Sequence, residues 1–183
     1  ENNLIVNGGF ETVDSHEAPS GWTAQGKDGL SLISDRDARE GKYCAFLRRA
    51  NDGSSDETWK DTMLATYVDS SPGSDLHLAS WRQKDIRVDP GKLYRLSFWV
   101  KADPMAQGMA AVSLFCRGEE GPAWPLKPIT IDEPMKWQHV TMLVRAQAGF
   151  NPISEIDLEF QLYQWRPGQP GDKTPQRLWI DDV

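Results

Sequence analysis

Two carboxylates and an amide recur at every second position near the end of the chain. Asp157, Glu159 and Gln161 therefore share one face of a predicted strand, because successive side chains of a strand point to opposite faces. Tyr163 and Trp165 continue that face. Two carboxylates at this spacing lie about 7 Å apart, within the range of about 5–9.5 Å that glycoside cleavage requires. Nothing in the sequence indicates that either carboxyl has its pKa tuned for acid–base catalysis.

A second alternating segment follows a turn at 89–91, in which Pro90 presets φ and Gly91 supplies a positive φ. Residues 93–101 are predicted to form a central strand of a β-sandwich. A large aromatic on the polar face of this strand is unusual for a face that meets only water, so we expect that face to line a groove. The core face is Tyr94, Leu96, Phe98 and Val100, and the polar face is Arg95, Ser97, Trp99 and Lys101.

The segment 76–88, before the same turn, is also strand-like. Its inward residues are predicted to be Ile86 and Val88, which places Trp81 on the opposite face. If the two segments pair as a hairpin, Trp81 and Trp99 lie on a common side.

The whole chain predicts an all-β fold. About nine or ten short strands alternate with turns rich in Gly, Pro, Asp and Ser, and no segment of about twelve residues has a helical period. This pattern is typical of a β-sandwich jelly roll of two antiparallel sheets. We expect a single domain spanning 1–183, because this length, with 39% hydrophobic residues, suffices for one core. Dinucleotide-binding, P-loop, zinc-spacing and GxSxG motifs are absent.

Charge and composition restrict the partners and the compartment. The net charge of −7 argues against nucleic acid or an anionic membrane surface, and no apolar run approaches the roughly 20 residues of a membrane span. The chain starts at Glu1 without a signal-peptide pattern, so we expect a mature form or a module of a larger protein. Cys44 and Cys116 allow one disulfide, whereas two buried free thiols are the commoner case.

Two tryptophans lie in predicted loops. Trp59 stands among Asp, Glu, Thr and Lys in the Asp-, Ser- and Gly-rich region 51–80, where it has few apolar neighbours. It is either a buried ring or a binding aromatic, since long loops in a compact domain tend to carry function. Trp124, between Ala123 and Pro125, is interpreted as a lid or a contact residue.

Acidic residues stand near both ends of the chain. A short apolar strand at 4–6 runs into an Asn-Gly-Gly bend and then Glu11. The bend is either a simple hairpin turn or, through Glu11 and a glycine carbonyl, half of a calcium site, because Ca²⁺ takes carboxylate and carbonyl oxygens. The last predicted strand ends with paired carboxylates at Asp181 and Asp182.

An ordered set of short motifs spans the chain and resembles the carbohydrate-binding modules of families four, nine and twenty-two. The set is specific in its order, although each motif alone consists mostly of turn residues. The long region 51–80 departs from the family pattern. The motifs are Asn3–Glu11, Ser20–Trp22, Gly41–Tyr43, Val88–Lys101, Trp137–Val140 and Trp179–Val183.

The resemblance implies a β-sandwich jelly roll with a structural calcium ion that ties the first strand region to the last strand. It implies as ligands the carboxylates of Glu11 and Asp181 and the carbonyls near Gly9 and at Glu40 or Lys42, with Asp182 in reserve.

The resemblance also implies sugar binding on the concave sheet. Sugar rings stack their C–H faces on aromatic planes, and their hydroxyls need fixed donors and acceptors. A planar Arg fork would suit an acidic sugar as well as a pair of hydroxyls. The stacking candidates are Trp81, Trp99, Tyr163 and Trp165, joined by the loop residues Trp59 and Trp124. The hydrogen-bonding candidates are Arg95, Arg117, Glu159 and Gln161.

Three functions follow from these observations. The first is a non-catalytic, monomeric polysaccharide-binding module of a secreted glycoside hydrolase or lyase. The second is a small glycoside-cleaving enzyme that uses Asp157 and Glu159. The third is an adhesion or spacer domain of the same fold, which would use its loop tips. The sequence does not separate xylan, β-glucan, galactan or an anionic algal polymer as the ligand.

Overall fold

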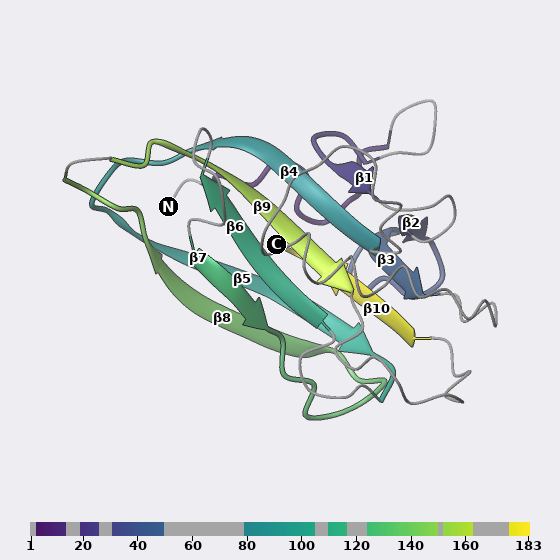
Figure 1. Cartoon of the computed structure of the whole chain (residues 1–183). Coiled ribbons are helices and arrows are strands. Elements are labelled where there is room, and N and C mark those ends of the chain that lie inside the picture. The colour runs from purple at the N-terminus through teal and green to yellow at the C-terminus, as the bar shows by residue number, and fades with distance from the viewer. Residues whose placement is uncertain are drawn as a thin grey trace, which may run out of the picture.

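The computed structural model describes residues 3–13, 19–25, 31–49, 79–104, 110–116, 124–149, 152–162 and 176–183. These ranges contain ten strands (Figure 1), and none of their residues forms a helix able to cross a membrane. The strands are β1 (Thr23–Gln25), β2 (Ser31–Ser34), β3 (Cys44–Arg49), β4 (Ala79–Arg87), β5 (Leu93–Ala102), β6 (Ala110–Cys116), β7 (Trp124–Pro128), β8 (Gln138–Arg145), β9 (Glu155–Leu162) and β10 (Gln176–Asp181).

The strands form two five-stranded antiparallel sheets that face each other (Figure 1). The order is β1-β4-β9-β6-β7 in one, here the β9 sheet, and β2-β3-β10-β5-β8 in the other, the β5 sheet. The chain crosses repeatedly between the sheets, as a jelly roll requires. The predicted β-sandwich jelly roll is confirmed. The predicted hairpin of 76–88 with 93–101 is wrong, because the turn at 89–91 joins strands of opposite sheets.

One core lies between the two sheets, and it follows the predicted alternation. Phe98 of β5 and Phe160 of β9 are fully buried and meet edge to face, with ring centroids 4.9 Å apart. Burial of such a ring stabilises the fold by about 1.5–3 kcal/mol. Trp22 closes the core beside Phe160, and its indole N–H donates to the carbonyls of Val6 and Asn7.

A β-bulge in β4 reverses the alternation that the sequence suggested. Between Gln83 and Ile86, β4 has two residues opposite Asp157 of β9, and Asp85 has a φ of 60°. The extra residue shifts the parity of the strand. Before the bulge the odd-numbered residues therefore point inward, and Trp81, only 3% exposed, belongs to the core. The prediction that Trp81 lies on the outer face is wrong for this reason.

Two shorter predictions also differ from the structure. Trp124, predicted to lie in a loop, instead begins β7, which is an edge strand and so tolerates Pro125 and Pro128. Leu4–Val6 does not form a strand. The side-chain amide of Gln83 instead bonds both backbone groups of Val6, as a strand neighbour would.

Cys44 is a buried free thiol, and burial raises its pKa to about 12. The side chain of Cys116 lies outside the part of the chain that the structure describes.

Candidate functional site

The residues predicted to share one groove lie on opposite outer faces of the sandwich. Glu159 and Gln161 project from β9, whereas Arg95 and Trp99 project from β5 in the other sheet. The prediction of a single groove with all four is wrong, because strand parity gives the face of a strand but not the sheet to which it belongs.

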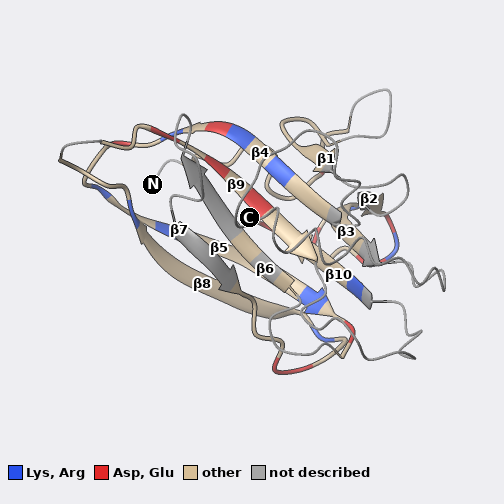
Figure 2. Ribbon diagram, in the orientation of Figure 1, with Lys and Arg blue, Asp and Glu red and all other residues tan. Residues whose placement is uncertain are grey.

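The outer face of the β9 sheet holds a group of polar side chains, here called the β9 polar cluster. Its members are Ser80 and Arg82 of β4 and Asp157, Glu159 and Gln161 of β9. Ser80 pairs across the strands with Gln161, and Arg82 pairs with Glu159. Figure 2 shows the acidic positions of β9 beside the basic positions of β4. Although these residues point away from the core, four of them are buried, and the side chain of Arg82 is 23% exposed.

The guanidinium of Arg82 lies between the two carboxylates of the cluster. Its Nη2 donates to Asp157 Oδ2 at 2.7 Å, and its Nη1 lies 4.0 Å from Glu159 Oε2. The other oxygen of Asp157 accepts the backbone N–H of Asp85 at 3.0 Å, so Asp157 also stabilises the bulge in β4. A charge-assisted pair of this length is stronger than a neutral hydrogen bond.

Burial raises the pKa of Glu159, which is 3% exposed. The neighbouring Ser80, Arg82 and Gln161 oppose that rise, and the charge of Asp157 adds to it. The fully buried Ser80 hydroxyl lies close enough to Glu159 to oppose this rise, but it makes no hydrogen bond of normal geometry within the described part of the chain.

Arg82 and Ser80 were missed by the sequence interpretation. Simple alternation from Ile86 back along β4 puts both of them on the inner face, and only the bulge turns them outward. The consecutive polar residues Lys84 and Asp85 interrupt the strand pattern and were the available signal for a bulge.

Trp99 is half-buried, and its ring is already in contact with two neighbours. The guanidinium carbon of Arg39 lies 3.8 Å from the ring centroid, and the His139 ring lies 4.9 Å away. Arg39 is held in place by Asp182, at 2.8 Å. The indole therefore already contacts two protein groups, and its role in stacking on a sugar stays a prediction.

The remaining predicted sugar contacts are only partly visible. Arg95 is exposed on the outer face of β5. Trp124 begins β7, but its side chain is not among those described. The positions of Trp59, Arg117, Tyr163 and Trp165 lie outside the described residues, so their roles stay predictions.

The predicted metal ligands are brought together at one end of the β5 sheet. Oε1 of Glu11 accepts the backbone N–H groups of Lys42 and Tyr43 at 2.8 and 2.9 Å. Gly41 has a φ of 66°, and a Cβ there would lie 2.3 Å from the Glu11 carboxylate. Glycine is therefore required at this turn, since it tolerates both the positive φ and the close approach.

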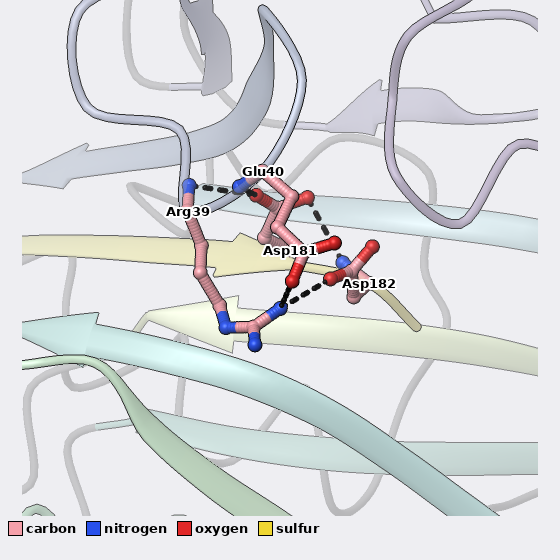
Figure 3. A network of polar contacts seen from close by, with 4 residues as sticks. All are labelled: Arg39, Glu40, Asp181 and Asp182. Atoms are coloured by element: carbon pink, nitrogen blue, oxygen red, sulfur yellow. Dashed lines mark hydrogen bonds and ion pairs between the residues drawn. The ribbon is translucent and has the colours of Figure 1, made fainter.

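Asp181 also binds the 39–43 turn (Figure 3). Its Oδ2 accepts the backbone N–H groups of Arg39 at 2.9 Å and Glu40 at 3.3 Å, and its Oδ1 accepts that of Asp182. The side chain is 1% exposed. Burial raises the pKa of Asp181 to about 6, and the nearby Asp182 adds to the rise while the three N–H donors oppose it.

Three acidic side chains converge on Gly9. A Cβ at this glycine would lie 3.6 Å from Asp182 Oδ1, 3.8 Å from Glu11 Cγ and 4.0 Å from Asp181 Oδ1. No three His, Cys, Asp or Glu side chains in the described ranges are close enough to hold a metal ion by themselves. A hard cation here would need backbone carbonyls as well, as the sequence interpretation assumed.

This chain is similar in fold to several solved structures of low sequence identity. No protein-family model and no curated protein matches the chain. Among solved structures, a family 16 carbohydrate-binding module shares 15% identity at a TM-score of 0.55, covering 98% of this chain and 96% of that one. A CBM4 structure shares 20% identity at 0.52 with the same coverage. The CBM22-2 xylan-binding domain of Paenibacillus barcinonensis Xyn10C shares 13% identity at 0.54, covering 96% and 94%.

Proposed function

We propose that this chain is a non-catalytic module that binds a polysaccharide through the outer face of the β9 sheet. The observation that carries the proposal is the β9 polar cluster, which collects donors and acceptors on a face that points away from the core. Such a cluster costs free energy unless its groups are satisfied. The similarity of fold to carbohydrate-binding modules supports the same function.

The chemistry of the cluster suits sugar hydroxyls, which both donate and accept. Glu159 offers an acceptor, Gln161 offers a donor and an acceptor, and the Ser80 hydroxyl makes no hydrogen bond of normal geometry with the described residues. Stacking rings would come from Tyr163 and Trp165, which follow β9 in the alternation predicted from sequence. The same proposal places the module outside the cell, attached to a glycoside hydrolase or lyase, because its polymeric ligands are extracellular.

Neutral glycans are expected to bind at least tenfold more tightly than anionic ones, about 1.4 kcal/mol. The described part of the cluster has two carboxylates and one guanidinium, and that guanidinium already bonds Asp157. A uronate or sulfate would face uncompensated negative charge. Affinity electrophoresis and calorimetry against xylan, β-glucan, galactan and a sulfated galactan would measure the difference. Preference for the sulfated polymer, or no binding to any glycan, would contradict the proposal.

Trp99→Ala is expected to lower the free energy of unfolding by about 1–2.5 kcal/mol, from the cation–π and aromatic contacts that it removes. Glycan affinity should stay within about twofold, because Trp99 lies on the other sheet. Urea unfolding and calorimetry with the best-binding glycan would separate the two effects. A large loss of affinity in a stably folded variant would indicate that the glycan binds on the outer face of the β5 sheet instead.

A glycoside-cleaving enzyme is the second candidate, and one observation favours it. Burial raises the pKa of Glu159, as a general acid requires, beside the Arg82-bound carboxylate of Asp157. Release of reducing ends from a glycan, abolished in Glu159→Gln, would establish the enzyme. Binding without turnover would establish the module.

We also propose a structural calcium ion at the junction of Gly9, Glu11 and Asp181, with carbonyls of the turn at Glu40 and Lys42 among its ligands. The convergence of three acidic side chains on a bare glycine supports this proposal. A bound Ca²⁺ would neutralise the carboxylates and join three segments that are far apart in sequence. Its chemical contribution would be structural only.

Calcium is expected to stabilise the fold by about 2.7 kcal/mol at 100 times its Kd, which raises Tm by about 5–10 °C for a domain of this size. Thermal unfolding in EDTA, in Mg²⁺ and in Ca²⁺ would measure the shift. A Glu11→Gln variant should lose most of the calcium-dependent part. Equal Tm values in EDTA and Ca²⁺ would show that the fold has no structural calcium ion. The proposal of a glycan-binding face would not be affected.

A further inference from the structure

Arg39 contacts the acidic residues at the end of the last strand through both its backbone and its side chain. Its backbone N–H donates to Asp181 Oδ2 at 2.9 Å. Its side-chain Nη1 donates to Asp182 Oδ2 at 2.8 Å and also to Glu40 Oε1 (Figure 3). The side chain is 26% exposed, so these contacts are partly shielded from solvent. Arg39 therefore connects the 39–43 turn with two neighbouring carboxylates.

The two oxygens of the Asp182 carboxylate face different groups. Oδ2 accepts the hydrogen bond from Arg39. Oδ1 lies 3.6 Å from the position that a Cβ on Gly9 would take, and Oδ1 of Asp181 lies 4.0 Å from the same position. The bond to Arg39 thus fixes the direction of the carboxylate and leaves its other oxygen turned toward Gly9, where the calcium ion is proposed.

Trp99 in turn holds the guanidinium of Arg39. The guanidinium carbon lies 3.8 Å from the centroid of the indole ring, which is a cation–π contact. Trp99 is the cross-strand neighbour of Asp181 on one side and of His139 on the other, and the His139 ring also contacts the indole. The ring therefore lies on the outer face of the β5 sheet, one strand away from the buried carboxylate of Asp181. This position gives the large aromatic on the polar face of β5 a role that needs no sugar.

We propose that Arg39 and Trp99 are positioning residues of the calcium site, and that together they orient the carboxylate of Asp182 toward it. The inference rests on the calcium ion proposed above. Groups that hydrogen-bond a metal-binding carboxylate fix its orientation, and their loss typically weakens metal binding 10–100-fold. Arg39 acts on Asp182 directly. Trp99 acts through Arg39, because a planar guanidinium that stacks on a ring is held in one position.

The sign of the effect separates positioning from simple charge. Arg39 is a cation beside a proposed cation site, so by charge alone its removal would tighten calcium binding. At physiological ionic strength, one screened unit charge near a divalent ion changes the affinity by about threefold. Positioning instead requires a loss of about tenfold or more, which is larger and opposite in sign.

Calorimetric titration of the full chain with Ca²⁺ is the test. Arg39→Met should weaken calcium binding at least tenfold, and Trp99→Leu about three- to tenfold, because the guanidinium is then less constrained. Arg36→Met is the matched control. Arg36 is exposed on the same segment, so this variant loses the same charge and should change the affinity less than threefold. Thermal unfolding in EDTA would verify that each variant folds, and glycan affinity at saturating Ca²⁺ should stay within about twofold of the parent.

A double variant tests whether Trp99 acts through Arg39. Arg39→Met combined with Trp99→Leu should bind Ca²⁺ like Arg39→Met alone, because the ring then has no guanidinium to hold. Trp99→Phe keeps an aromatic face and should bind within about threefold of the parent. If Arg39→Met does not fold, the loss of affinity in Trp99→Leu and its recovery in Trp99→Phe decide the proposal.

Three results would overturn the inference in different ways. Unchanged or tighter binding by Arg39→Met would remove the role of Arg39 and leave the calcium ion in place. Additive losses in the double variant would show that Trp99 does not act through Arg39. A parent chain that binds no Ca²⁺ would overturn the calcium proposal and this inference together, whereas the glycan proposal would stand.

Discussion

Replacing Arg82 with Met is expected to lower the free energy of unfolding by about 3–5 kcal/mol at pH 7, the usual cost of leaving buried charge without its partner. The variant keeps the apolar stem of the side chain but removes the guanidinium between Asp157 and Glu159. Both carboxylates would then lie close together on β9 in a buried environment, where like charges repel. The same change should abolish detectable glycan binding, because it disorders the cluster proposed to bind the ligand.

The pH dependence of this loss identifies its cause. Burial already raises the pKa of Glu159, so the neutral form becomes favoured as the pH falls, and the neutral form needs no cation. The deficit of Arg82→Met relative to the parent should therefore shrink between pH 7 and pH 5. Denaturant unfolding at several pH values would measure it.

Arg87→Met is the matched control for Arg82→Met. Arg87 lies on the same strand but is exposed, and an exposed ion pair contributes about 1 kcal/mol or less. The variant should unfold like the parent and bind glycan like the parent. If the two variants lose similar stability at pH 7, the interpretation of the β9 polar cluster as a buried charge network fails.

Local alternation predicted the inner faces of the strands well, because burial imposes the same two-residue period that the sequence shows. Leu96, Phe98 and Val100, and likewise Leu158 and Phe160, are buried as expected. The turn at 89–91 was also predicted, since the positive φ of Gly91 is a local requirement.

The assignment of strands to sheets could not be predicted in the same way. A short turn between two amphipathic strands suits a hairpin, but it also suits an arch that places the two apolar faces against each other across the core. The second arrangement holds for β4 and β5. Consequently Trp99 and Glu159, which the sequence placed in one groove, lie on opposite outer faces.

The bulge at Asp85 limited the prediction for a different reason. One inserted residue reverses every later assignment along a strand, and its hydrogen bond to Asp157 comes from a residue far away in sequence. As a result, Trp81 lies on the inner face and Arg82 on the outer face, the reverse of what alternation predicts. The convergence of Glu11, Asp181 and the 39–43 turn was anticipated only by resemblance to a family, because no local pattern brings the two ends of a chain together.

In EDTA, the parent is expected to have a pH-dependent stability that Asp181→Asn removes. The folded pKa of Asp181 is raised from 3.8 to about 6, chiefly by burial. The folded state therefore binds this proton more tightly than the unfolded state does. Stability from this group is fully present below pH 4 and is lost as the pH rises through 6. A shift of two units corresponds to at most about 3 kcal/mol.

Unfolding in urea with EDTA, at pH values from 4 to 7, would measure this contribution. The stability of the parent should fall across that interval, whereas the Asn variant should vary much less, since its amide oxygen can still accept the N–H of Arg39. Asp182→Asn is the control, because Asp182 is adjacent but only half-buried. It should keep most of the parent's pH dependence, with the midpoint moved slightly down, since the charge of Asp182 adds to the rise in the pKa of Asp181. Coincident profiles for all three proteins would show that Asp181 does not carry the effect.

Calcium should reverse the sign of the same dependence. Metal ligation requires the deprotonated carboxylate, so Ca²⁺ would lower the pKa of Asp181 and make its charged form the stabilising one. The parent should then gain stability between pH 4 and pH 7 in Ca²⁺, in the interval where it loses stability in EDTA. In the Asn variant, both the loss of stability in EDTA and the gain in Ca²⁺ should be smaller than in the parent. A parent whose pH profile is the same in Ca²⁺ and in EDTA would leave Asp181 as a cap of the 39–43 turn and nothing more.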